Sequence, residues 1–242
     1  MDEHEKSPLR IGWESARANA VPMVILWAIA VAMVGAYYLF PQVRQMLDPF
    51  VRWHLEWRWL SAFFWQAVFC GLVPGLFLLT CRTIRPPRVA LTVVAQTIWS
   101  GIFGVACNEL YRLFAIVFGD GTDWPSVLAK TLIDQFVWTV LVVAPANAVF
   151  FFWVGRDFSL ARVRREWRGP FFRRIVLPNL VSNWIVWIPL VTVVFLFPFS
   201  LQIFVNGIVC SFWTLMCLQI GKRTADASSI PVGVERSRRR LL

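Results

Sequence analysis

Long apolar stretches constrain this chain more than any other feature of its sequence. A helix that crosses the ~30 Å hydrocarbon layer of a bilayer needs roughly 20 predominantly apolar residues. Six stretches meet this requirement: residues 21–40, 59–80, 89–118, 131–154, 175–197 and 200–220. The composition agrees, because 58% of the residues are hydrophobic and 16% are charged, against roughly a quarter charged in a globular protein. The sequence therefore predicts an all-α fold, a polytopic transmembrane helical bundle of about six spans.

The basic residues predict how this bundle is oriented, because Lys and Arg are retained in cytoplasmic loops. If both termini are cytoplasmic, nineteen of the 24 Lys and Arg residues lie in cytoplasmic segments and four lie in outer connections. We therefore expect a cytoplasmic N-terminal segment (1–20), a transmembrane domain (21–220) and a basic cytoplasmic tail (221–242). The net charge of +10 then mainly encodes orientation. Whether the first stretch fully spans stays open, because segment 1–20 holds four acidic residues beside three basic ones.

A basic stretch between the fourth and fifth spans has a second interpretation. Leu160, Val163, Trp167 and Phe171 recur at helical spacing among arginines. Such a helix could lie on the inner leaflet, where each Arg near anionic lipid contributes ~1 kcal/mol. The candidates for this lipid contact are Arg162, Arg164, Arg165 and Arg168. The simpler alternative is a cytoplasmic retention signal without a specific lipid partner.

The N-terminus favours a bacterial inner membrane. Segment 1–20 is too acidic for a mitochondrial transit peptide, and no small-residue cleavage site follows the first apolar stretch. An organellar membrane is the alternative. The bilayer is the expected partner, a homo-oligomer stays open, and nucleic-acid binding is disfavoured because no separate basic domain is present.

Catalytic chemistry finds little support in the sequence. His4 and His54 lie outside the predicted spans and far apart, and no glycine-rich phosphate loop is present. The five cysteines lack the paired short spacing of metal sites and are expected to pack within the spans. We therefore predict no enzymatic activity, no metal and no cofactor.

Polar residues inside the spans are the remaining candidates, because such groups are costly in hydrocarbon. On straight helices Arg112 and Asp134 would lie about 9 and 5 Å from the outer ends of their spans, so they could pair. Glu109 lies one turn from Arg112, and Lys130 lies one turn from Asp134. These residues predict an outer polar vestibule.

Further amides extend this set. Gln202 and Asn206 could complete the vestibule, and Asn147 and Asn183 could hydrogen-bond across helices nearer the inner face. The predicted pore or polar network is Asn108, Glu109, Arg112, Lys130, Asp134, Gln135, Asn147, Asn183, Gln202 and Asn206. The alternative is that these groups are interhelical ties, which contribute about 0.6 kcal/mol each.

Three short motifs occur in a familiar order. They are Gly104-Val-Ala-Cys-Asn108-Glu-Leu-Tyr111, Lys130-Thr-Leu-Ile-Asp134-Gln135, and Asn183-Trp184-Ile-Val-Trp187-Ile-Pro189 followed by Phe195, Pro198 and Trp213. On these residues the chain resembles the Mpv-seventeen and peroxisomal-membrane-protein-twenty-two family of small integral membrane proteins, over about residues 95–220. It departs from the family pattern at Val191 and Val194, where the family has Gln and Asn, and near Gln202, where the family has Arg.

The resemblance implies a channel or a passive pore for small solutes, because family members are proposed to form channels or to influence solute balance. The replacement of two polar family positions by Val would alter or abolish such conduction. A non-conducting membrane scaffold or assembly factor is the alternative. Secondary transport would need paired interrupted helices. Pro74 and Pro145 lie in the second and fourth spans, but no internal repeat is evident.

Overall fold

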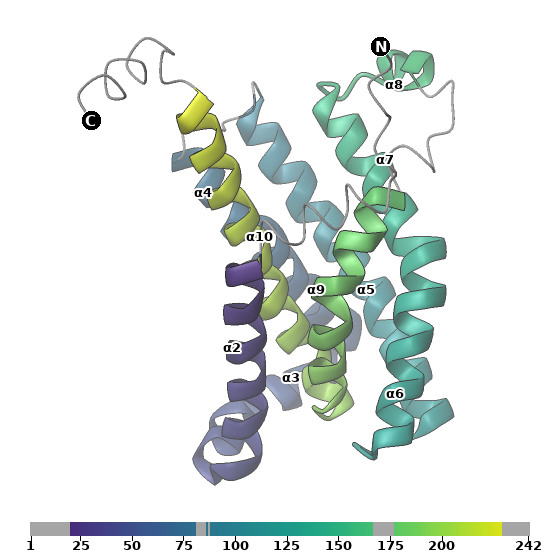
Figure 1. Cartoon of the computed structure of the whole chain (residues 1–242). Helices are drawn as coiled ribbons and strands as arrows, with labels where there is room; N and C mark the ends of the chain where they lie inside the picture. Colours follow the sequence, from purple (N-terminus) through teal and green to yellow (C-terminus); the bar gives the residue numbers. More distant parts are fainter. Residues whose placement is uncertain (1–19, 81–85, 87, 167–176, 229–242) are drawn as a thin grey trace, which may run out of the picture.

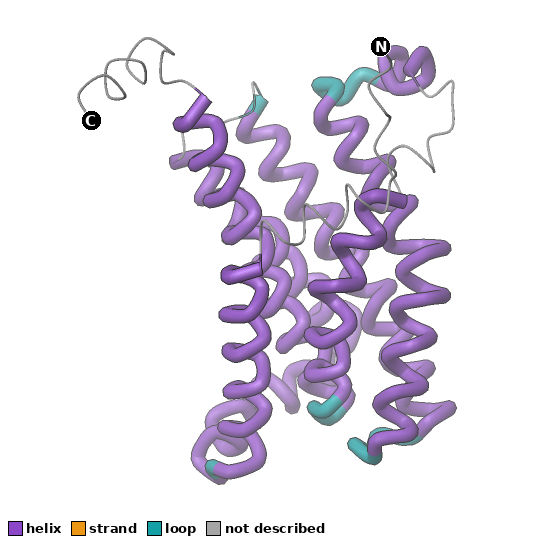
Figure 2. Tube along the Cα trace, in the orientation of Figure 1, coloured by secondary structure: helices purple, strands orange, loops and turns teal. Residues whose placement is uncertain are grey.

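The computed structural model describes residues 20–80, 86, 88–166 and 177–228, and these form an all-α bundle (Figure 1). Figure 2 shows helices joined by short connections throughout this part of the chain. The elements are α2 (Ala20–Leu39), α3 (Pro41–Gln66), η1 (Ala67–Leu72), α4 (Val73–Thr80), α5 (Val89–Phe118), α6 (Trp124–Ile133), η2 (Asp134–Val143), α7 (Ala144–Gly155), α8 (Leu160–Glu166), α9 (Leu177–Phe195) and α10 (Phe199–Ser228). The all-α part of the predicted fold is confirmed.

Within the described residues, three continuous helices are long and apolar enough to cross a membrane: Pro41–Thr80, Val89–Phe118 and Trp124–Gly155. The predicted stretch 89–118 coincides with α5. The stretch 59–80 is the second half of a longer helix that begins at Pro41 and bends at Trp57, where the backbone leaves helical geometry. Shorter apolar helices occupy Met23–Leu39, Asn183–Phe195 and Phe199–Leu215, at the other predicted spans.

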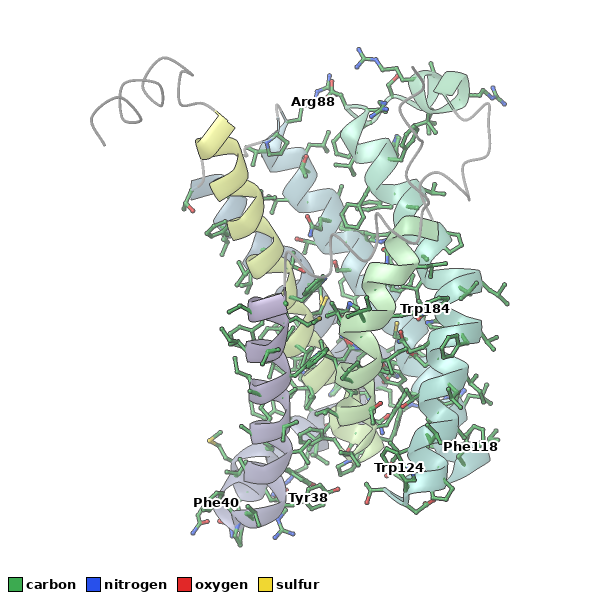
Figure 3. The ribbon with its side chains drawn as sticks, viewed as in Figure 1. Tyr38, Phe40, Arg88, Phe118, Trp124 and Trp184 are labelled. Atoms are coloured by element: carbon green, nitrogen blue, oxygen red, sulfur yellow. The ribbon has the colours of Figure 1, made fainter. Side chains whose placement is uncertain are left out.

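The bundle has two distinct ends (Figure 3). At the Phe40 end lie the turns after α2, α5 and α9, and at the Arg88 end lie the start of α5 and the end of α7. Figure 1 shows α2 beside α9 and α10, reaching from the Phe40 end to about the middle of the bundle. The indole of Trp27 fixes α2 there by donating to the backbone oxygen of Val186, at 3.1 Å.

The Phe40 half of the bundle is solidly packed. Its core contains Leu26 of α2, Phe114 of α5 and Phe195 of α9, which are all at least 97% buried. Residues 50–59, which are rich in Trp and Phe, lie within α3, and Phe50 stacks there on Phe204 of α10 at 4.7 Å between centroids. Since α2 adds its side chains to this half only, the two halves differ in how completely they are filled.

Glycines allow the helix that contains η1 to approach α5 closely. A Cβ on Gly71 would lie 2.4 Å from the Cα of Thr97, and one on Gly75 would lie 2.6 Å from a Val93 methyl. Small residues at such crossings let transmembrane helices pack by direct backbone contact. This contact forms one wall of the space described below.

Two π-helical segments interrupt the long helices, each shortly before a proline. Segment η1 precedes Pro74, and η2 precedes Pro145. Proline has no N–H, so the carbonyl four residues earlier loses its helical partner and the ladder is easily shifted. Short π-helical segments are rare and often lie at functional sites.

Candidate functional site

A cavity of about 570 Å³ lies inside the bundle, between α5 on one side and η2 and α7 on the other. Segment η1 and helices α4, α9 and α10 complete its walls. It extends from Pro86 and Val154 near the Arg88 end to Tyr111 and Asp134 in the middle of the bundle. Its polar lining residues are Gln66, Thr92, Gln96, Ser100, Asp134, Gln135, Thr139, Asn147, Asn183, Asn206 and Thr214.

The end of the cavity that lies in the middle of the bundle carries polar side chains. Asp134 is 5% exposed, and its carboxylate accepts a hydrogen bond from Nε2 of Gln135 at 2.7 Å. Opposite these residues, Nδ2 of Asn206 donates to the hydroxyl of Tyr111 at 2.8 Å. Phe195 packs edge-on against Tyr111 at 5.2 Å between centroids. Beyond this layer the apolar core closes the cavity toward the Phe40 end.

A tryptophan links the two long walls. Trp99 of α5 stacks on Phe150 of α7, with 4.7 Å between ring centroids and an interplanar angle of 3°. Its Nε1 also donates to Oδ1 of Asn147 at 2.9 Å. At the Arg88 end of the bundle, Arg88 and Asp157 form an ion pair at 3.2 Å. These contacts keep α5 and α7 together while leaving space between them.

Side chains of other helices donate hydrogen bonds to backbone oxygens of both π-helical segments. Nε2 of Gln96 donates to the carbonyl of Cys70, four residues before Pro74, at 3.3 Å. Nε1 of Trp184 donates to the carbonyl of Gln135 at 2.9 Å. Neither bond was predicted. The prolines were the only sequence signal for these irregular segments, and their partners on other helices carry no recognisable pattern.

Three thiols line the same space: Cys70, Cys107 and Cys210. The thiol of Cys70 donates to Oε1 of Gln66 at 2.9 Å, and Gln66 in turn donates to the carbonyl of Ile203 at 3.0 Å. The cysteines therefore belong to the cavity wall as well as to the packing between helices. Within the described part of the chain, no group of three or more His, Cys, Asp and Glu side chains could hold a metal ion.

The charged residues of the predicted outer vestibule lie elsewhere. Arg112 pairs with Glu109 at 2.7 Å rather than with Asp134, and Glu109 also accepts from Nε1 of Trp59 at 2.7 Å. This cluster lies on the α3-facing side of α5, outside the cavity lining. The predicted contact between Glu109 and Arg112 is confirmed, whereas the pairing of Arg112 with Asp134 is wrong, because the two side chains leave their helices in different directions.

Lys130 and Gln202 serve as local ties. Lys130 is 1% exposed, and its Nζ donates to the carbonyl of Gly119 at 2.7 Å, across the α5–α6 turn. Gln202 donates to the carbonyl of Phe197 at 2.9 Å. Nearby, Asp123 caps α6 by accepting from the backbone N–H of Ser126 at 3.0 Å, and hydrogen bonding from Ser126 lowers the pKa of Asp123.

The remaining predicted residues fall into two groups. Asn147, Asn183 and Asn206 line the cavity, whereas Asn108 is fully buried and neither of its amide atoms has a partner in the described part of the chain. Four of the family-motif residues line the cavity: Gly104, Tyr111, Trp187 and Trp213. The indole of Trp184 donates to a backbone oxygen of η2. Pro189 lies within α9, and Pro198 lies in the α9–α10 turn. At the departures from the family pattern, Val191 lines the cavity and Val194 is in the core.

The predicted lipid-contact arginines are partly described. Arg162 and Arg164 are exposed on α8, beside Leu160, which is 71% exposed. The side chain of Arg165 and the whole of Arg168 lie outside the described residues.

No family model matches this sequence, and no solved structure matches the fold.

Proposed function

We propose that this chain is an integral membrane protein that carries small solutes through its central cavity, as a channel or passive pore. Six helices would span a bacterial inner membrane, with an organellar membrane as the alternative. Both termini would be cytoplasmic, which makes the Arg88 end the cytoplasmic end. No catalytic role is part of the proposal.

The observation that carries this proposal is a cavity inside an apolar bundle, with polar side chains from several helices among its mostly apolar lining. Polar side chains within hydrocarbon prefer water or a partner. Here amides, hydroxyls and one carboxylate from several helices face one space of about 570 Å³. A volume of this size is typical of sites that enclose small molecules, which are roughly 300–1,000 Å³.

The resemblance to the Mpv-seventeen family supports the same proposal. Its motif residues come from three separate stretches of sequence, yet Gly104, Asp134 and Trp187 all line the cavity. Residues that define a family resemblance and meet around one space are expected to share a role there. Passage through the whole bundle would also require the packed layer around Phe114 and Phe195 to open.

The test is solute leak and single-channel current from the purified protein in liposomes. Ser100 of α5 lines the cavity, and Ser100→Trp would fill part of it. The matched control is Ile102→Trp on the same helix, since Ile102 is 57% exposed on the outer face. We expect flux from the wild type and from Ile102→Trp, and a strong loss in Ser100→Trp. Silent wild-type bilayers would reject the proposal, and equal flux in both variants would reject this cavity as the path.

One observation favours a non-conducting scaffold as the second candidate. The Phe40 half is closed by apolar side chains, and Lys130 and Gln202 there bond nearby carbonyls. A scaffold predicts no flux, impaired folding when these ties are removed, and a protein that co-purifies with the chain.

A further inference from the structure

We propose that the solute this cavity accommodates is a small organic cation, with its ammonium group beside Asp134 and its alkyl groups against tryptophan rings. This inference rests on the proposed function and names its substrate class. It is argued from the charge, the acceptors and the aromatic walls of the cavity.

The charge of the cavity is opposite to that of the protein. Among the described lining residues Asp134 is the one charged side chain, although the chain has a net charge of +10. The two nearest cationic candidates from the sequence are engaged elsewhere: Arg112 pairs with Glu109, and Lys130 bonds the carbonyl of Gly119. Neither of these side chains pairs with Asp134, so its carboxylate can pair with a cation that enters from outside.

The polar end of the cavity offers acceptors. One oxygen of Asp134 accepts from Gln135, and a carboxylate has about four lone-pair sites, so it can accept further bonds. Oε1 of Gln135 is buried and has no partner in the described part of the chain. An ammonium group carries donors or a diffuse positive charge and satisfies such acceptors, whereas an anion would be repelled by them.

The walls are aromatic. Trp138, Trp187 and Trp213 line the cavity, in addition to Trp99, whose ring is already stacked on Phe150. Cations within about 6 Å of a ring centroid are attracted to its face, and aromatic cages of this kind recognise quaternary ammonium groups. A hydrated metal ion would prefer an all-oxygen shell. A carboxylate combined with indole walls therefore selects an organic cation, and the volume of about 570 Å³ leaves room for its alkyl groups.

The experiment compares choline with 3,3-dimethyl-1-butanol, in which an uncharged carbon replaces the quaternary nitrogen. Binding is followed by tryptophan fluorescence and calorimetry on the full chain in nanodiscs, for wild type, Asp134→Asn and Glu109→Gln. Asp134→Asn removes the charge at constant shape. Glu109→Gln is the matched control, because Glu109 is a carboxylate of the same bundle that lies outside the cavity lining.

We expect the wild type to bind choline about tenfold or more tightly than the uncharged alcohol. Asp134→Asn is expected to lose that preference, and Glu109→Gln is expected to keep it. Equal binding of the two compounds by the wild type, or an unchanged preference in folded Asp134→Asn, would overturn the inference.

A second measurement needs only the wild type, in case Asp134→Asn does not fold. Cys210 lines the cavity and is partly accessible, and its alkylation can be followed by mass spectrometry of its own peptide. Choline should slow its alkylation by a small maleimide and the alcohol should not, and equal rates with both would count against a cation site. Flux measurements separate the two proposals. Solute leak without choline binding would support the pore and reject the cation site. Charge-dependent choline binding by a protein that gives no flux would support the cation site and reject the pore.

Discussion

The close approach of η1 to α5 at Gly71 predicts a specific sensitivity at this residue. A Cβ at this position would lie 2.4 Å from the Cα of Thr97 and 3.0 Å from its backbone nitrogen. Ordinary carbon contacts lie at ~3.5–4.0 Å, so η1 and α5 would have to separate by about 1 Å. Overpacking of this kind costs ~1–3 kcal/mol, and 1 kcal/mol corresponds to about 2–4 °C in the melting temperature of a chain of this size.

We therefore expect Gly71→Ala to lower the melting temperature in mild detergent by about 5 °C. Gly35→Ala is the matched control, because nothing lies within 4 Å of a Cβ there. Alanine at this helical position should be neutral or stabilise by about 0.5–1 kcal/mol.

A double substitution separates a backbone clash from a side-chain clash. At Gly75 the obstacle is a Val93 methyl at 2.6 Å, so Val93→Ala should partly rescue Gly75→Ala. Thr97→Ala should not rescue Gly71→Ala, since the Thr97 Cα remains. Equal melting temperatures for Gly71→Ala and Gly35→Ala would refute the close packing of η1 against α5.

Three further substitutions test individual contacts. Lys130→Met removes the buried bond to Gly119 and should destabilise the α5–α6 turn by about 1–3 kcal/mol, measured by thermal unfolding; no change would mean that Nζ reaches water instead. Trp99→Phe keeps the stacking on Phe150 but loses the bond to Asn147, and should cost about 1 kcal/mol, whereas Asn147→Ala in the Trp99→Phe background should add little. The lowered pKa of Asp123 means that its cap stabilises the fold above the usual aspartate pKa and is lost as pH falls through the lower, folded value. The difference in melting temperature between wild type and Asp123→Ala should therefore be present at neutral pH and vanish in acid, and a constant difference would contradict a carboxylate cap.

The sequence predicted the helices where apolar length was the deciding quantity. Stretch 89–118 matched α5 because the chain is bounded there by Arg88 and by Gly119, whose φ of 77° ends the helix. The prediction missed the first part of the helix Pro41–Thr80, because residues 41–58 are amphipathic and pack through one face only. Counting apolar residues detects spans, but it does not detect a helix that continues beyond one.

Five of the ten predicted polar residues line the cavity, namely Asp134, Gln135, Asn147, Asn183 and Asn206. Asp134 and Asn206 were identified by their cost in hydrocarbon, and both line the cavity. Glu109 satisfied the same criterion, yet it lies two residues beyond the cavity-lining Cys107, about 200° around the helix axis, and so faces Trp59 of α3. Depth along a helix follows from sequence spacing, whereas rotation about the axis is set by packing. The cavity therefore lies toward the Arg88 end, whereas a polar vestibule was expected on the outer side.

The two π-helical segments connect the fold with the cavity. Both interrupted helices, Pro41–Thr80 and Trp124–Gly155, run from the Phe40 end to the Arg88 end, and η1 and η2 lie on different walls of the cavity. Each interruption is a π-helical segment within a continuous helix, which differs from the unwound helices of secondary transporters. Because the carbonyls of Cys70 and Gln135 are held by side chains of other helices, one wall cannot shift without changing bonds made by another. Any opening of the Phe40 half should therefore involve both segments, and Gln96→Leu and Trp184→Phe, each of which removes one of these bonds, should alter flux without changing the side chains that face Asp134.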